Sequence, residues 1–173
     1  MKDKSSINLR KSMKRGSVEH ETKVPDKEGE IMAIATNEVI SIPPTKSIKD
    51  TAKVMMEHAF RRLPITDPGS GKVLGIVIVM DILDFFGGGK KFNIIENKYE
   101  DNFLAAINEP IREIMTRDVI CLSNKSSIND TIETMLSNQI GAIPLVDADD
   151  KLVGIVTERD IALSLAGVVT DEV

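Results

Sequence analysis

Gly154-Ile-Val-Thr157-Glu-Arg-Asp160-Ile161 is the stretch that decides the fold, because the chain carries it twice. The other copy reads Gly75-Ile-Val-Ile78-Val-Met-Asp81-Ile82. Each copy begins with β-branched residues, which favour a strand, and then reaches an acidic residue suited to the first turn of a helix. Each copy therefore predicts a strand that leads directly into a helix.

The similarity extends upstream of this stretch. Residues 36–67 align with 116–147 at an offset of 80, and residues 72–82 align with 151–161 after one extra turn residue in the first copy. Of the 43 aligned pairs, 16 are identical, which is far above chance. Such internal periodicity indicates a repeat architecture. We therefore expect an N-terminal arm, a first repeat, a linker, a second repeat and a C-terminal tail, at residues 1–30, 31–88, 89–110, 111–167 and 168–173.

Each repeat predicts the order strand, helix, strand, strand, helix. Ser47 with Asp50, and Ser127 with Asp130, are acidic variants of the capping box and mark the start of the first helix in each repeat. The turn-rich segment Asp67-Pro-Gly-Ser-Gly71 separates two apolar runs and predicts a hairpin. One repeat buries too little surface alone, so we expect both to pack as one α/β (α+β) module with a ligand cleft between them. The strands are expected at Val39–Ile42, Leu63–Thr66, Leu74–Val79 and Val119–Leu122.

The composition is that of an ordinary globular protein. Of 173 residues, 42% are hydrophobic and 28% are charged, close to the average. The longest apolar run, Val73–Met80, has eight residues, whereas a membrane helix needs about 20, and the polar N-terminus does not read as a signal peptide. Cys121 is the only cysteine, and His20 and His58 have no further ligand at metal spacing, so we expect no disulfide and no metal site. The resulting expectation is a cytoplasmic protein with no membrane segment.

Charge is unevenly distributed along the chain. The formal net charge is −5, yet residues 1–15 carry +5 and the remaining residues carry −10. Duplex nucleic acid is bound largely by neutralising its phosphates, so the acidic body does not favour a nucleic-acid partner. The basic arm is expected to be flexible, as chain ends commonly are.

The repeated segments resemble a tandem pair of CBS domains, also called a Bateman module. The resemblance rests on Gly141-Ala-Ile-Pro144-Leu-Val-Asp147 and Gly154–Ile161 in the second copy, and on Arg62-Leu-Pro64-Ile-Thr-Asp67 and Gly75–Ile82 in the first. It implies β-α-β-β-α repeats that sense adenine nucleotides (AMP, ADP or ATP) or related adenosyl compounds, require no cofactor, and control an attached or associated protein. It also implies a homodimer, because pairs in this family often form a flat disc of four units.

The resemblance further assigns a ligand site. It places Thr157 and Asp160 at a ribose, where a carboxylate can accept from two adjacent hydroxyls and the threonine adds a donor. The helix that follows would present free N–H groups to a phosphate. Arg61 and Arg62, from the opposite repeat, would add a guanidinium fork. The implied site is completed by Ile40 against the adenine and by Ala35 and Thr36 at its border.

The first repeat departs from this pattern. Ile78 stands where the second repeat has Thr157, so Asp81 has no hydroxyl partner. Gly141 and Ala142 stand where the other cleft has its two arginines. We therefore expect a second cleft that lacks both the hydroxyl and the phosphate-binding cations, and that binds ligand weakly or selects an uncharged adenosyl compound. Its implied residues are Asp81, Thr116, Ile120 and Gly141.

Structural explanations compete with these assignments. Thr157 and Asp160 form a capping box whether or not a ligand binds. An acidic residue such as Asp81 suits any first helical turn, and Arg61 and Arg62 suit the end of a helix as solvated charges.

The function therefore has more than one interpretation. The alternative to ligand sensing is a protein-interaction adaptor with unliganded clefts, whose basic arm contacts a partner or nucleic acid. An enzyme is not expected, because no nucleophile–base pair, metal cluster or pair of catalytic carboxylates can be named. The sequence does not identify the regulated protein. The homodimer is expected because the last helix of each repeat carries more apolar residues than one sheet face can cover; these are Ile82, Leu83, Phe86, Ile161, Leu163 and Leu165. We expect the methionines Met55, Met56 and Met80 to pack in the core.

Overall fold

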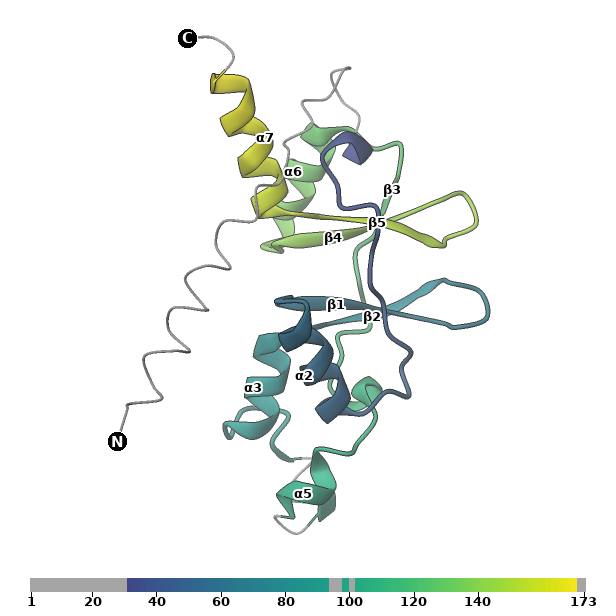
Figure 1. The fold of residues 1–173 in the computed structure, drawn as a ribbon, viewed down its shortest axis with the longest axis vertical. Helices are drawn as coiled ribbons and strands as arrows, with labels where there is room; N and C mark the ends of the chain where they lie inside the picture. Colours follow the sequence, from purple (N-terminus) through teal and green to yellow (C-terminus); the bar gives the residue numbers. More distant parts are fainter. Residues whose placement is uncertain (1–30, 94–97, 100–101, 171–173) are drawn as a thin grey trace, which may run out of the picture.

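Two small sheets lie next to each other in the middle of the molecule, and helices lie on the outer side of each (Figure 1). This computed structural model describes residues 31–93, 98–99 and 102–170. The architecture is the mixed helix-and-strand module of two similar halves that the repeat predicts. The expected arm at 1–30 and the last residues of the expected tail lie outside the described residues.

The first half is a two-stranded antiparallel hairpin with two helices. Strands β1 (Arg62–Thr66) and β2 (Val73–Ile78) pair from Arg62 opposite Ile78 to Thr66 opposite Val73, with one irregularity next to Thr66. Helix α3 begins at the residue after β2, as predicted from the repeated stretch. Its elements are α2 (Ile48–Glu57), β1 (Arg62–Thr66), β2 (Val73–Ile78) and α3 (Val79–Phe86).

The second half repeats this plan with one more strand. Strand β3 (Leu122–Ser123) pairs parallel to β4 (Ala142–Val146), and β4 pairs antiparallel to β5 (Leu152–Thr157). Helix α7 begins directly after β5 and continues three residues into the expected C-terminal tail. Its elements are β3 (Leu122–Ser123), α6 (Ile128–Asn138), β4 (Ala142–Val146), β5 (Leu152–Thr157) and α7 (Glu158–Thr170). Short helices in the described residues that connect the halves or precede them include η1 (Ile31–Ala33), α5 (Phe103–Ala106) and η2 (Ile111–Glu113).

The predicted capping residues start α2 and α6. The Ser47 hydroxyl accepts the Asp50 N–H at 3.0 Å, and the Ser127 hydroxyl accepts the Asp130 N–H at 3.0 Å. Each bond satisfies a backbone donor that a helix start otherwise leaves unpaired. The sequence thus located both helix starts correctly.

The leading strand of the first repeat is shorter than predicted. Instead of a strand over Val39–Ile42, only Ile42 pairs, in a single parallel bridge to Ile65. The next two residues are Pro43 and Pro44, which have no N–H to donate and therefore cannot extend a ladder. In the second repeat, Asn124 stands at the position of Pro44 and donates its N–H to Val146 O at 2.9 Å, so β3 extends where the first repeat stops.

The segments that precede the two repeats cross over to the opposite half. Ile31 is fully buried in the core of the second half, and the Thr36 backbone exchanges hydrogen bonds of 2.9 and 3.0 Å with Ile155 in β5. In return, Ile111 and Ile114 are fully buried in the core of the first half. Figure 1 shows the first described segment starting beside α6 and running across both sheets. Each hydrophobic core is therefore completed by residues from the other half.

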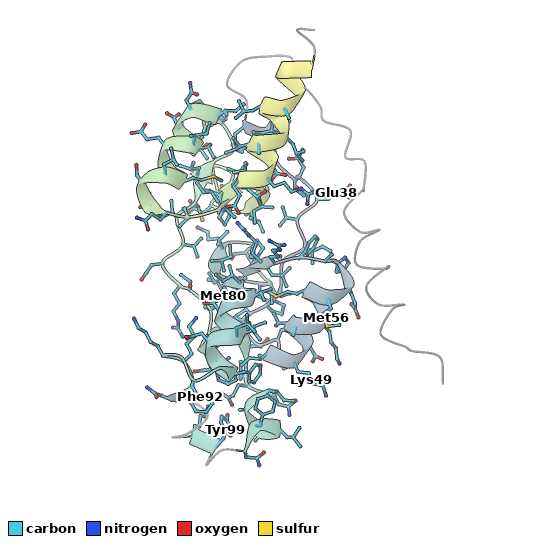
Figure 2. All side chains as sticks on the ribbon, turned by 90° about the vertical axis from the view of Figure 1, so that its left-hand side faces the viewer. Glu38, Lys49, Met56, Met80, Phe92 and Tyr99 are labelled. Carbon is cyan, nitrogen blue, oxygen red and sulfur yellow. The ribbon has the colours of Figure 1, made fainter. Side chains whose placement is uncertain are left out.

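The expectation that the methionines pack in the core is correct only for Met55. Its side chain is 4% exposed, whereas Met56 is 74% and Met80 is 62% exposed. Figure 2 shows Met56 and Met80 on the side of the molecule where α2 and α3 lie. Residue 56 follows a buried position on the same helix and so turns outward, and Met80 lies in the first turn of α3. No helix in the described part of the chain is long and apolar enough to cross a membrane.

Candidate functional site

The junction between β5 and α7 carries the predicted ribose-binding pair. Asp160 Oδ2 accepts the Thr157 N–H at 2.8 Å and the Thr157 hydroxyl at 2.7 Å, and the Asp160 N–H points back to that hydroxyl at 3.3 Å. These bonds cap the helix start. Oδ1 of Asp160 has no hydrogen bond to any described residue, so the second carboxylate oxygen can accept from a ligand while the first holds the cap.

The crossing segment brings a second predicted part of the site to this junction. Thr36 pairs with Ile155, two residues before Thr157 on β5. Ala35 packs against the core of the second half, whereas Ile40 packs against the core of the first. The backbone between Ala35 and Ile40 therefore passes from one half to the other beside β5.

The two predicted arginines lie in different surroundings. Arg62 Nη1 donates to Gly141 O, and its Nη2 lies 3.6 Å from Glu158 Oε1, in the first turn of α7. The side chain of Arg62 is 23% exposed. Arg61 is exposed, and its carbonyl accepts the Val79 N–H at 2.9 Å, at the start of α3 instead of α7. The geometry therefore brings Arg62, and not the backbone of Arg61, to the α7 start.

The predicted second cleft lies at the junction between β2 and α3. Asp81 Oδ2 accepts the Ile78 N–H at 2.8 Å, so Asp81 caps α3 as Asp160 caps α7. Thr116 pairs with Ile76 on β2, which mirrors the position of Thr36 on β5. Ile120 is 37% exposed. Gly141 lies at the start of α7, where its carbonyl accepts the Glu158 N–H at 3.2 Å.

Lys91 lies against Asp81 at this junction, and sequence reasoning missed it. Its Nζ lies 2.5 Å from Asp81 Oδ1 and 2.5 Å from Ile114 O. The side chains of Lys91 and Asp81 are 27% and 13% exposed, so the pair is largely shielded from water. The sequence predicts no phosphate-binding arginine at this junction, and the linker places a different cation there, on Asp81. No motif marks this lysine, since it follows a glycine-rich joint outside the aligned repeat.

A pocket in the described residues lies elsewhere, at the hairpin end of the first half. Its volume is about 330 Å³ and its lining includes Ser41, Thr66 and Asp67. The Ser41 and Thr66 hydroxyls bond each other at 2.9 Å. The backbone and side chain of Ser70 hydrogen-bond to the Asp67 carboxylate and hold its pKa below the ordinary value. Because these polar groups already hydrogen-bond to one another or to Ser70, we do not place the ligand here.

No described group of three or more histidine, cysteine, aspartate or glutamate residues is arranged to hold a metal ion. Burial, assisted by the charge of Asp150, raises the pKa of the Cys121 thiol. A thiol is a poor nucleophile when it is protonated. The described ionisable groups thus offer binding contacts at the two helix starts.

Comparison with known proteins identifies the repeat. The family model named CBS domain matches residues 29–88 and 111–171. Protein MJ1225 of Methanocaldococcus jannaschii is 45% identical over 136 residues, which cover 78% of this chain and 49% of that protein. Its crystal structure, described as that of a candidate archaeal homologue of γ-AMPK, superimposes with a TM-score of 0.77 over 80% of this chain and 50% of that chain.

A second solved structure, the CBS domain pair of protein MJ0100 in complex with 5′-methylthioadenosine and S-adenosyl-L-methionine, is 29% identical. It has a TM-score of 0.63 and covers 78% of this chain and 98% of that chain. The chain spans about half or less of the length of the first curated relatives that it matches. Two copies of the family model, placed on the two halves of the fold, show that the chain belongs to the CBS-domain family as a tandem pair.

Proposed function

We propose that this chain is a regulatory module that senses an adenine nucleotide or a related adenosyl compound at the junction of β5 and α7. The observation that carries the proposal is the carboxylate of Asp160, which has one oxygen in the helix cap and the other without a partner among the described residues. The MJ0100 domain pair, which was crystallised with two adenosyl compounds, supports this ligand class.

Each contact has a chemical role in this proposal. The Asp160 carboxylate accepts the ribose hydroxyls, and charge-assisted bonds of this kind are stronger than neutral ones. At the start of α7 the N–H groups of Glu158 and Asp160 already donate to Gly141 O and to the Thr157 hydroxyl, so the positive end of the helix dipole is what suits a phosphate there. Arg62 lies beside the same helix turn, held by Gly141 O, and would exchange this carbonyl for a ligand phosphate. Ile40 and Ala35 border the base, and Thr36 and Arg61 complete the proposed set.

The output of the module is control of another protein or domain, without catalysis by this chain. A region of inosine-5′-monophosphate dehydrogenase from M. jannaschii is 26% identical over 128 residues, which make up 22% of that enzyme. A pair of this type thus occurs as a small part of a larger enzyme. This supports a regulatory role for the present chain.

Isothermal titration calorimetry with AMP, adenosine, S-adenosyl-L-methionine and 5′-methylthioadenosine tests the proposal. We expect saturable binding of at least one of them, and loss of binding on Asp160→Ala. No heat with any of the four would contradict ligand sensing and favour the adaptor function instead.

We also propose that two copies of the chain associate through their helices. The exposed apolar side chains Met56 on α2, Met80 and Leu83 on α3, and Leu165 on α7 support this proposal. Of the six residues expected to be in excess, Leu83 and Leu165 are more than half exposed, whereas Ile161 is buried. Symmetric dimers are the commonest closed assemblies. Sedimentation equilibrium should give twice the chain mass of 19.0 kDa, and a mass of one chain at micromolar concentration would contradict it.

A further inference from the structure

We infer that Lys91 is a built-in occupant of the ribose position at Asp81, and that it thereby confines ligand binding to the cleft at Asp160. The inference rests on the proposed function, since it concerns which of two similar clefts accepts the adenosyl compound. The ammonium of Lys91 lies on the Asp81 oxygen that corresponds to the unpartnered Oδ1 of Asp160.

The loop that follows α3 holds Lys91 in this place. The Asp84 carboxylate accepts the N–H groups of Lys90 and Lys91 at 3.2 and 3.1 Å. Gly88 has φ of +82°, which side chains of L-residues rarely adopt, and a Cβ at Gly89 would come within 1.6 Å of Asp84 Oδ1. The glycines therefore let the backbone turn back tightly over Asp84.

As far as the structure describes the second half, no counterpart of this loop follows α7. Helix α3 ends after eight residues, at the glycines, whereas α7 continues for 13 residues. At the offset of 79 residues, Lys91 corresponds to Thr170, which still belongs to α7. Among the described residues the chain therefore returns to a capping aspartate in the first half alone, and none of them hydrogen-bonds to Oδ1 of Asp160.

A ligand at the second cleft would have to displace this lysine. A ribose hydroxyl that bonds to Asp81 would replace the charge-assisted bond between Lys91 and Asp81, which is largely shielded from water. Displacing the lysine would also break its hydrogen bond to Ile114 O. The ligand gains little from the exchange, because the cleft offers Ile78 where the other offers Thr157. Lys91 is thus a specificity determinant that reduces two similar clefts to one working site.

Calorimetric titration with adenosine tests the inference, because adenosine carries the ribose hydroxyls without a phosphate that would be attracted to the lysine. The variants are Lys91→Met, the matched control Lys90→Met, whose exposed side chain has no described partner, and Lys91→Met combined with Asp81→Ala. We expect Lys91→Met to bind one adenosine more per chain, at a site at least about tenfold tighter than the wild-type chain shows there. Lys90→Met should match the wild-type chain, and Asp81→Ala should abolish the added site. An unchanged number of sites in folded Lys91→Met, or an added site that survives Asp81→Ala, would overturn the inference.

The outcomes separate this inference from the proposed function. If the wild-type chain binds nothing and Lys91→Met gains a site that depends on Asp81, the inference stands and the Asp160 site fails. If the wild-type chain binds through Asp160 and Lys91→Met adds nothing, the inference fails and the proposed function stands. Because Lys91→Met removes the partner of a shielded carboxylate, Lys91→Gln is the second variant, and circular dichroism reports on its fold. If neither variant folds, the lysine is a required structural partner and not a displaceable occupant, which also overturns the inference.

Discussion

Asp160→Ala removes two kinds of contact at once, and the structure allows each to be measured separately. Oδ2 of this carboxylate caps α7 through Thr157, and Oδ1 is the acceptor proposed for the ligand. The substitution should therefore lower both the stability of the chain and its affinity for an adenosyl ligand. If Asp160 only caps the helix, stability alone should fall.

The expected magnitudes follow from the contacts. Loss of a helix cap costs about 1 kcal/mol, which corresponds to a fall in Tm of about 2–4 °C for a chain of this length. A hydrogen bond to a charged group contributes about 1.5–3 kcal/mol, so loss of the ligand contact should weaken binding by about tenfold to hundredfold.

Asp130→Ala is the matched control, because Asp130 is exposed and caps α6 by the same device, with Ser127 as its partner. It should lower Tm by a similar amount and leave affinity unchanged. Affinity is measured by calorimetry with AMP, and Tm by circular dichroism on the same samples. Asp81→Ala should change affinity little, because Lys91 already occupies that carboxylate. The reasoning is refuted if Asp160→Ala behaves like Asp130→Ala, or if Asp81→Ala and Asp160→Ala lose affinity equally.

Three more predictions concern other parts of the molecule. Arg62→Ala should weaken AMP binding while sparing adenosine, because only AMP presents a phosphate to the guanidinium; equal effects in calorimetry on both ligands would contradict this. Burial would raise the pKa of Glu109, but hydrogen bonds from Lys98 and Tyr99 outweigh it and hold that pKa below its ordinary value of 4.5. The contribution of Glu109 to stability is therefore present above pH 4.5 and is lost as the pH falls through its lower pKa in the folded state. The acid-induced fall in Tm should therefore be smaller in Glu109→Gln than in the wild-type chain. Met80→Glu should shift the sedimentation mass from two chains to one, whereas Leu104→Glu, at a similarly exposed apolar position on α5, should not.

The local elements of the fold could be predicted from the sequence because short-range chemistry determines them. Ser47 and Ser127 located two helix starts, and the turn beginning at Asp67 located a hairpin, since caps and turns depend on neighbouring residues. The strand expected at Val39–Ile42 was wrong in length, because its pairing depends on a donor that Pro43 and Pro44 do not have. The crossing of the leading segments could not be predicted, since similarity between repeats shows which segments are alike and not which ones pack together.

The candidate site shows the same division. Thr157 and Asp160 could be placed together because they are three residues apart at a helix start. Lys91 could not be placed on Asp81, ten residues earlier in the chain, since the contact depends on a backbone turn set by Asp84 and the glycines that follow α3. The structure brings Lys91 to Asp81 at the start of α3, which the sequence did not predict, and it places the Gly141 carbonyl at the start of α7.

The exchange of leading segments determines what can be moved from one protein to another. Ile31 belongs to the core of the second half, and Ile111 and Ile114 belong to the core of the first. A gene fragment that encoded one repeat with its own leading segment would carry the apolar residues that complete the core of the other repeat. It would lack the apolar residues that complete its own core. The pair is therefore the smallest piece that can be grafted onto another polypeptide with both cores intact, and a graft of this kind has to begin upstream of Ile31.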